Sequence, residues 1–356
     1  MEERPTAVHE YVGNPHVHTP YSDGQALHAE VARAAAQAEL DFVIVTDHNV
    51  WVDGFEGYYD DVLLLVGEEI HDVRLQPQAN HLLVYNAEAE LSPLASDMQA
   101  LIDEASQWGG FCYLAHPYER ESKVGPDMAA LSWTDWEITG YKGLEIWNYM
   151  SEFKGLVRNK LAALYYAYFP SRGIKGPFKY ALRKWDELLA QGHQVAAIGG
   201  ADAHGNTYSL GPFKRVLFPY EYLFRCVNTH ILTKHPFNGN LAHDKALVYE
   251  ALRSGRTWAG YDLPASTTGF RFQARSGFNS ALMGEELARA GATIFDIQTP
   301  QNADIRLLLN GKVIARTQGK RLKFTSALAG VYRVEAYRNY RMGRRGWIFS
   351  SPIYVS

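Results

Sequence analysis

The stretch Asp41-Phe-Val-Ile-Val-Thr-Asp-His48 decides the fold class of this chain. Its four central residues are apolar and rich in β-branched side chains, which is typical of a parallel strand covered on both faces. A carboxylate and an imidazole follow directly after the apolar run. In parallel α/β folds, active sites are built where the strands end. The stretch therefore predicts a buried strand that leads into a functional site.

The same alternation of apolar strands and helical segments extends through about residue 256. Further short apolar runs predict strands at 12–17, 62–66, 81–85, 111–115, 143–147 and 195–199. Segments with helical patterning lie between them, at 27–40, 96–108 and 152–190. Alternating elements of this kind indicate an α/β fold, a sheet with helices outside, either open or closed into a barrel.

The pattern changes near residue 256. From Gly269 onward, short runs alternate apolar and polar residues, and Asn310-Gly311 between two such runs is a strong hairpin signal. Several short strands joined by turns suggest a small antiparallel β-sandwich. We therefore predict two domains, at 1–256 and 257–356, which suits a chain of 356 residues.

The composition excludes several classes of protein. Hydrophobic residues make up 47% and charged residues 21%, so the chain is neither disordered nor collagen-like. The formal charge of -4 provides no global basic field for nucleic acid, and no apolar run reaches the ~20 residues of a membrane span. The first five residues contain no apolar signal segment, so we expect a cytoplasmic protein. Two cysteines, Cys112 and Cys226, exclude a disulfide scaffold.

Histidines and carboxylates gather at the ends of the predicted strands. They are His16, His18, Asp23, Asp47, His48, Glu68, Glu69, His81, His116, Asp202 and His204. So many imidazoles and carboxylates at one edge need a partner, which a cluster of divalent cations supplies. Ligands of these two kinds suit Zn, Mn or Fe without discriminating among them.

Each of these residues also has a simpler interpretation. A single histidine at a strand end is more often a hydrogen-bonded turn residue than a ligand, but the conjunction of these motifs is far less expected by accident. The remaining histidines lack that support, so we interpret them as surface or turn residues: His9, His28, His71, His193, His230, His235 and His243.

Five short motifs resemble those of PHP domains, the polymerase and histidinol phosphatase metallohydrolases. They are His16-Val-His-Thr-Pro-Tyr-Ser-Asp-Gly24, Thr46-Asp-His48, Gly67-Glu-Glu69, Ala115-His-Pro117 and Asp202-Ala-His204. The resemblance covers about residues 12–256. It implies a distorted (β/α)7 barrel with up to three metal ions at its C-terminal face.

The resemblance also implies a set of nine metal ligands. His16, His18, Glu69 and Asp202 would hold the first ion. Glu69, His81 and His116 would hold the second, and Asp23, His48 and His204 the third. We therefore expect two to three divalent transition metals, with Glu69 bridging the first two. Glu69, Asp202 and His204 are the expected catalytic residues.

The C-terminal region resembles a narrower group, the carbaryl-hydrolase-like subgroup. Ala251-Leu-Arg-Ser-Gly-Arg-Thr257 and Ser350-Ser-Pro-Ile-Tyr-Val355 carry this resemblance. It implies that amides, esters and carbamates are candidate substrates in addition to phosphoesters.

Two ions ~3.5–4 Å apart can bind a bridging water and lower its pKa toward ~7. The expected function is a metal-dependent phosphoesterase that uses this bridging hydroxide on a small anionic substrate. A metal-dependent amidase, esterase or carbamate hydrolase and a non-catalytic, metal-stabilised module are the alternatives.

The stretch from Phe153 to Trp185 holds eight basic residues and no acidic one. It follows a predicted strand closely, so it would leave the sheet at the edge that carries the ligands. A wall of positive potential there would favour anionic substrates. Arg158 and Arg172 are the expected substrate-binding residues, because guanidinium binds phosphate or carboxylate bidentately. A helix with a solvated basic face is the alternative. We expect a small-molecule partner and neither nucleic acid nor membrane, and we leave a homo-oligomer open.

Overall fold

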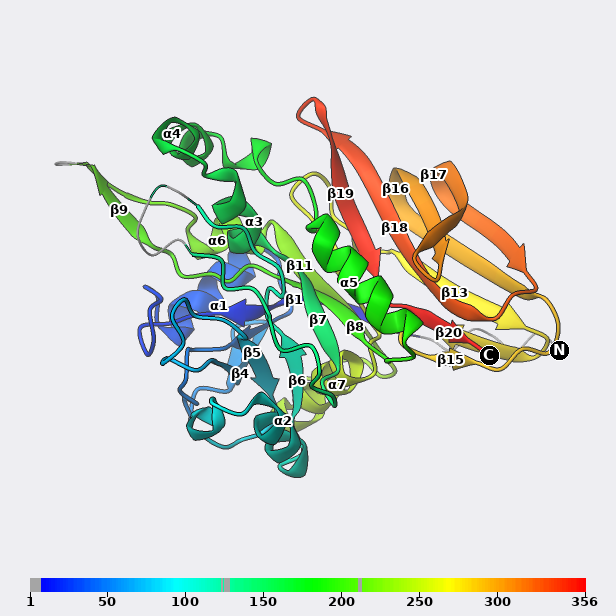
Figure 1. Ribbon diagram of the computed structural model, residues 1–356, viewed down its shortest axis with the longest axis horizontal. Coiled ribbons are helices and arrows are strands. Elements are labelled where there is room, and N and C mark those ends of the chain that lie inside the picture. The colour runs from blue at the N-terminus through cyan, green and yellow to red at the C-terminus, as the bar shows by residue number, and fades with distance from the viewer. Residues whose placement is uncertain (1–7, 123, 125–128, 211–212) are drawn as a thin grey trace.

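The structure is a computed structural model that describes residues 8–122, 124, 129–210 and 213–356 (Figure 1). The expectation drawn from the first five residues lies outside the described residues. Within the described ranges, no helix combines the length and the apolar character that crossing a bilayer requires.

The first two-thirds of the chain alternates strands and helices, which confirms the predicted α/β class. Its strands are β1 (His9–Val17), β2 (Phe42–Val45), β3 (Gly57–Tyr59), β4 (Val62–Ile70), β5 (Leu82–Tyr85), β6 (Phe111–Leu114), β7 (Gly143–Asn148), β8 (Ala196–Gly200), β9 (Thr207–Leu210), β10 (Phe213–Val216) and β11 (Val227–Thr233). Its helices are α1 (His28–Gln37), α2 (Met98–Gln107), α3 (Tyr149–Leu156), α4 (Lys160–Tyr168), α5 (Lys179–Ala190), α6 (Tyr220–Phe224) and α7 (Leu241–Arg253), with short 3-10 turns η1 (Ser92–Leu94) and η2 (Pro170–Arg172).

One predicted helix, at 152–190, is divided into α3, α4, η2 and α5. Asn159 ends the first part and caps α4, because its side chain accepts a hydrogen bond from the Ala162 N–H at 2.9 Å. Pro170 and Pro177 then interrupt the helical pattern, since proline lacks the N–H that an interior helical position needs.

The central strands are held by burial on both faces. All residues of β2 and β4 are buried, and the apolar face of α1 packs into the same core through Val31, Ala32 and Ala35. Each buried Val, Leu or Ile side chain contributes roughly 1.5–3 kcal/mol relative to exposure. This packing holds the ends of β2 and β4 in fixed positions.

The strands from β1 to β8 do not close into the barrel that the resemblance implies. β2 is parallel to β1 and to β4, and β7 is parallel to β6 and to β8, but β5 is antiparallel to both of its neighbours. β1 pairs with β11, and in the described part of the chain no continuous ladder joins it to β8. An isolated bridge joins Val17, at the end of β1, to Ala203, three residues after the end of β8.

The last third of the chain is built of strands. They are β12 (Thr257–Tyr261), β13 (Arg271–Ser276), β14 (Asn279–Leu282), β15 (Glu286–Leu287), β16 (Thr293–Leu309), β17 (Lys312–Ser326), β18 (Gly330–Tyr340), β19 (Gly343–Ser350) and β20 (Ile353–Val355). The predicted Asn310-Gly311 hairpin is confirmed: it joins β16 to β17, and both residues have positive φ, 48° and 75°. These strands enclose a core of their own that includes Phe295 and Trp347.

The sheet is continuous across the predicted domain boundary. β12 pairs with β11 on one side and with β19 on the other, so backbone hydrogen bonds link the two predicted domains. Helix α5 lies between the two groups of strands in Figure 1. The strands near the C-terminus are mostly antiparallel, although β15 and β20 are parallel, and the sandwich arrangement stays a prediction.

Candidate metal centre

All nine predicted ligands meet at one edge of the sheet. They come from the ends of the parallel strands or the turns after them, except that Glu69 lies within β4 and His81 lies just before β5. Because β5 runs antiparallel to its neighbours, its first residue lies at the same edge as their last residues. Backbone hydrogen bonds from His18 N–H to Ala203 O (2.9 Å) and from Asp202 N–H to His16 O (3.0 Å) bring the segment after β8 against the end of β1.

Glu69 occupies the centre of the cluster. Its Oε2 lies 2.9 Å from His16 Nε2 and 3.2 Å from His18 Nε2. Its Oε1 lies 2.8 Å from His81 Nδ1 and 3.0 Å from His116 Nε2. Oε2 also lies 3.2 Å from His48 Nδ1. The two oxygens of one carboxylate thus face two separate groups of imidazoles, three at Oε2 and two at Oε1, which is the geometry expected of a bridging ligand.

The other two carboxylates extend the cluster toward solvent. Asp202 Oδ1 lies 3.1 Å from His18 Nε2, which completes a group of ligand atoms with His16 and Glu69. Asp23 Oδ1 lies 3.1 Å from His204 Nε2 and 3.8 Å from His48 Nε2, and these three residues form another group with His18. Each group brings its potential ligand atoms within 4.8 Å of one another.

Strain in the backbone marks two of these positions. His116 and Asp202 have positive φ values, 26° and 55°, in a region that residues with a Cβ seldom adopt. Such strain persists only where the surroundings impose it, and it concentrates at functional sites. It directs both side chains into the cluster.

The residues fit divalent ions. Both ring nitrogens of His18 and Nδ1 of His48 are buried without a hydrogen bond, although carboxylate oxygens lie 3.1–3.2 Å from His18 Nε2 and His48 Nδ1. Ligands about 2.0–2.1 Å from a tetrahedral ion are separated by roughly 3.3 Å. The distances between these nitrogens and the carboxylate oxygens therefore match those between two ligands of one metal ion.

The charge state of the central carboxylate also suits a metal. Burial alone would raise the pKa of Glu69, but His16, His48 and His81 around it lower that pKa well below its usual range. Asp202 behaves in the same way. Burial alone would raise its pKa, but the nearby imidazoles lower that pKa well below its usual range. Both side chains are ionised at neutral pH, which is the form that binds a cation.

Glu145 in β7 contacts the cluster, and the sequence patterns did not point to it. Its carboxylate lies 3.1 Å from His16 Nδ1 and accepts hydrogen bonds from the His116 N–H (2.9 Å) and from Asn148 Nδ2 (3.0 Å). This contact orients the His16 ring so that Nε2 faces Glu69, as carboxylates do behind metal-binding histidines. The sequence does contain one indication of its role, because Glu145 is the single acidic residue within the otherwise apolar strand β7.

Gly200 makes room for that contact. A Cβ at this position would lie 2.2 Å from Glu145 Oε1 and 2.9 Å from the Cβ of His16. Any larger residue would therefore displace the carboxylate or the ring. Gly200 thus belongs to the support of the metal cluster.

Two further residues lie beside the cluster with different roles. His71, interpreted above as a surface or turn residue, is buried, and its ring stacks on that of His81 with centroids 4.2 Å apart. Asp47 accepts hydrogen bonds from the Thr19 N–H (2.7 Å) and hydroxyl (2.6 Å) and from the Ser22 hydroxyl (2.6 Å). Asp47 therefore anchors the turn that carries Asp23.

The predicted substrate-binding arginines lie apart from these contacts. Arg158 and Arg172 are exposed, and Arg172 Nη1 donates to the Tyr165 hydroxyl at 3.1 Å. Among the described residues, no hydrogen bond or ion pair connects either side chain to the nine ligands. Their role in substrate binding stays a prediction.

No protein-family model and no curated protein matches this sequence. Among solved structures, it is similar to a two-domain protein from Bacteroides vulgatus ATCC 8482 that contains a predicted PHP-like metal-dependent phosphoesterase. That match has 16% identity and a TM-score of 0.44, and it covers 97% of this chain and 95% of the other. A proposed metal-dependent phosphoesterase from Bifidobacterium adolescentis ATCC 15703 matches with 14% identity and a TM-score of 0.34, covering 54% of this chain and 87% of the other.

At such identities and TM-scores, neither match assigns an activity to this chain. The resemblance to the carbaryl-hydrolase-like subgroup stays a prediction.

Proposed function

We propose that this chain is a metal-dependent phosphoesterase of the PHP type that hydrolyses a small anionic substrate. The observation that carries the proposal is the position of Glu69, whose two oxygens face two separate groups of imidazoles at 2.8–3.2 Å. A carboxylate in this position can bridge two ions, and paired ions are the usual means of phosphoester hydrolysis without a protein nucleophile.

The nine clustered residues would hold two to three divalent ions, of Zn, Mn or Fe. His16, His18, Glu69 and Asp202 would bind one, Glu69, His81 and His116 a second, and Asp23, His48 and His204 a third. When bound, such ions activate a water molecule at neutral pH and polarise the oxygen of a phosphoryl or carbonyl group. In this proposal, residues 12–256 form an open variant of the (β/α)7 barrel, and residues 257–356 form a β-sandwich domain.

Exposure of the side chains indicates how a substrate would approach. Glu69, His16 and His18 are fully buried, whereas His204 and Asp202 are 13% and 14% exposed and Asp23 is 57% exposed. The reacting group would therefore enter past Asp23 and meet His48, which is 22% exposed, together with Asp202 and His204 before the buried ligands. Glu69, which is buried beneath these residues, would hold the ions in place.

His204 is oriented for contact with the substrate by its own backbone. Its Nδ1 lies 2.8 Å from the carbonyl oxygen of Asp202, so Nδ1 carries the proton and Nε2 is left to face Asp23 and the entrance. In this proposal, Asp202 and His204 contact the reacting group of the substrate, and Glu69 positions the ions.

A parallel turnover assay tests the proposal. Protein reconstituted with Zn or Mn would be supplied with p-nitrophenyl phosphate, bis-p-nitrophenyl phosphate, a naphthyl ester and a naphthyl carbamate, and elemental analysis would count the ions. We expect two to three ions per chain and metal-dependent turnover of a phosphate ester. Turnover confined to the ester or carbamate would replace the proposal with the amidase, esterase or carbamate class. Bound ions without any turnover would favour the non-catalytic module.

A further inference from the structure

Helix α4 presents a stripe of apolar side chains to solvent. Leu161, Leu164, Tyr165 and Phe169, which directly follows the helix, have the spacing that places residues on one helical face. They are 79%, 51%, 43% and 47% exposed. None of the nine residues of α4, all of which the structure describes, is buried, and the helix lies at the outer edge of the molecule in Figure 1. The described part of the chain therefore leaves this apolar stripe uncovered.

A stripe of this kind normally faces a protein core. In α5, Ala181, Trp185, Leu188 and Leu189 have a similar spacing, and all four are buried. An isolated helix of nine residues is marginal in water, because most helical stability in proteins comes from packing of the apolar face. Contiguous apolar residues on a protein surface mark interaction sites. The apolar stripe on α4 therefore indicates a partner.

Exposed cations lie at both ends of the apolar stripe. Arg158 and Lys160 precede it, and Arg172 follows it. The Arg172 guanidinium lies 5.1 Å from the centroid of the Phe169 ring and donates a hydrogen bond to the Tyr165 hydroxyl at 3.1 Å. Long basic side chains can cover apolar surface while their charged ends reach a polar layer. Positive charge thus bounds the apolar stripe.

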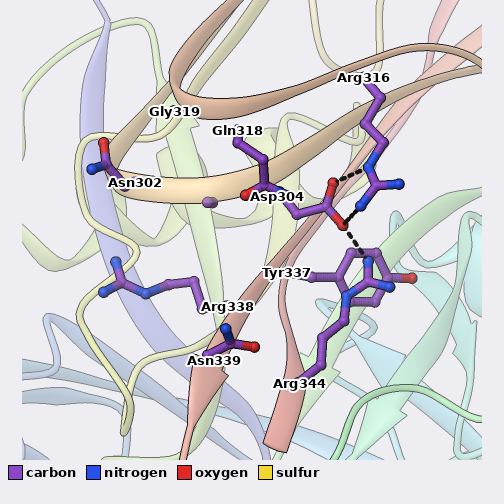
Figure 2. Close-up of a pocket in the computed structure, with 10 residues that line it drawn as sticks. Asn302, Asp304, Arg316, Gln318, Gly319, Tyr337, Arg338, Asn339 and Arg344 are labelled. Carbon is purple, nitrogen blue, oxygen red and sulfur yellow. Dashed lines mark hydrogen bonds and ion pairs between the residues drawn. The ribbon is translucent and has the colours of Figure 1, made fainter.

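These three cations have no carboxylate partner. None of them takes part in an ion pair within the described ranges, where the surrounding basic segment pairs only through Lys154 and Lys184. Arginines of the C-terminal strands differ in this respect. In the cavity of about 580 Å³ formed by β16, β17, β18 and β19, Asp304 contacts both Arg316 and Arg344 (Figure 2). The charge beside α4 is therefore available to an anionic partner.

The charge of the chain is distributed unevenly. Residues 153–185 carry eight basic side chains and no acidic one, which gives this segment a formal charge of +8. The whole chain has a charge of -4, so the remainder carries −4 − 8 = −12. Such an asymmetry orients a protein in an electric field and favours the approach of one side to a negatively charged surface.

We propose that α4 docks this protein on an anionic lipid surface. The apolar stripe would enter the boundary between headgroups and acyl chains, and Arg158, Lys160 and Arg172 would pair with lipid phosphates. Tyr165 suits this position, because its ring is apolar and its hydroxyl is polar. Docking of this kind needs no spanning helix. It therefore replaces the expectation that membranes are not a partner, which depended on the absence of an apolar run long enough to cross a bilayer.

A second copy of this chain fits the apolar stripe less well. In a two-fold dimer the same patch of each copy meets, so the cations beside the two stripes would face one another. No acidic residue in the segment 153–185 of either copy could separate them. Like charges opposed across an interface weaken association. A lipid surface that carries phosphates and carboxylates provides the missing anions.

Co-sedimentation with lipid vesicles tests the proposal. Vesicles of phosphatidylcholine alone are compared with vesicles in which phosphatidylserine replaces part of the phosphatidylcholine. We expect at least ~10-fold tighter binding to the vesicles that contain phosphatidylserine at low salt, and a progressive loss of this binding as salt is added. Equal binding to the two kinds of vesicle, or binding to neither, would overturn the proposal.

Variants of α4 locate the docking surface. Leu161→Gln should weaken binding to the phosphatidylserine vesicles about 10-fold, and Lys160→Gln about 5-fold. Both side chains are exposed, so the Tm should not change. Leu328→Gln and Lys320→Gln are the matched controls, because they change exposed side chains in the C-terminal region, and their binding should remain within ~2-fold of the parent. Variants of α4 that bind as tightly as these controls would overturn the role of this helix.

Sedimentation velocity without lipid tests the second copy as the occupant. We expect Leu161→Gln to leave the oligomeric state unchanged. A dimer of the parent protein that Leu161→Gln dissociates would assign the apolar stripe to self-association and overturn the lipid proposal. Neither result affects the proposed phosphoesterase function, because the turnover assay contains no lipid.

Discussion

At the scale of single residues, the arrangement around Glu69 makes the most specific prediction. Glu69→Gln should lower the metal content of both adjoining sites and reduce turnover at least ~100-fold, because each carboxylate oxygen faces a separate group of imidazoles. Elemental analysis and the phosphate-ester assay measure the two effects. Loss of a single ion with the other retained would contradict a bridging role.

The neighbouring Glu68 is the matched control for that substitution. It points to the opposite face of β4, where burial and a hydrogen bond with Glu90 raise its pKa to about 9. Its carboxyl is therefore neutral at pH 7, and glutamine resembles it closely. Glu68→Gln should leave metal content and turnover nearly unchanged.

Glu145 makes a second prediction at this scale. Glu145→Gln weakens the support behind His16 and His116, so we expect metal affinity to fall about 10–100-fold. Competition with a chelator measures that affinity. Because Glu145 contacts His16 at Nδ1, on the side of the ring away from Glu69, and is not one of the nine proposed ligands, saturating metal should restore most of the turnover. A defect that persists at saturation would contradict a positioning role.

At the scale of elements, Glu152 joins helix α3 to the segment before α5. Its carboxylate accepts hydrogen bonds from Trp147 Nε1 (2.8 Å) and from the Lys175 N–H (2.6 Å), yet complete burial raises its pKa to about 7. The folded protein therefore retains a proton that the unfolded chain, with a glutamate pKa near ~4.3, releases. Stability should fall as the pH rises from about 4.3 to 7, by on the order of 3 kcal/mol in total.

Urea unfolding of the wild type and Glu152→Gln between pH 5 and 8 measures this contribution. Glutamine cannot titrate, so the difference in stability between the two proteins should shift in favour of the variant as the pH rises to 7. A difference that stays constant across this range would show that Glu152 is already ionised at pH 5.

At the scale of the whole molecule, one arginine ties the C-terminal strands to the α/β part. Arg333 on β18 is buried, donates two hydrogen bonds of 2.8 Å to Asp186 on α5, and contacts Glu335 at 2.7 Å. Arg333→Ala would leave buried Glu335 without its cation, and breaking such a pair costs about 3–5 kcal/mol. We expect urea unfolding at a lower concentration, whereas Arg321→Ala, which removes an exposed ion pair with Asp296, should change the unfolding midpoint much less. Equal losses in the two variants would contradict this role.

The sequence by itself determined the α/β class, the Asn310-Gly311 hairpin and the gathering of histidines and carboxylates in or next to the ends of strands. These features depend on local patterns: apolar runs form strands, turn residues end them, and each motif follows its own strand. Local patterns did not predict that β5 runs antiparallel to its neighbours. His81 still reaches the cluster, because an antiparallel strand begins at the edge where its neighbours end.

Only the tertiary structure decided which polar residues support the cluster and which charges are buried. Glu145 lies 129 residues from His16 in the sequence, and the contact exists because β7 and β1 converge and Gly200 leaves room for it. His230, interpreted as a surface or turn residue, is buried between Glu10 and Asp262 at 3.2 and 3.1 Å. The open sheet and the cavity on β16 to β19 likewise arise from pairing between distant strands. Such contacts depend on the closure of long loops, whereas sequence patterns report only the residues a few positions apart.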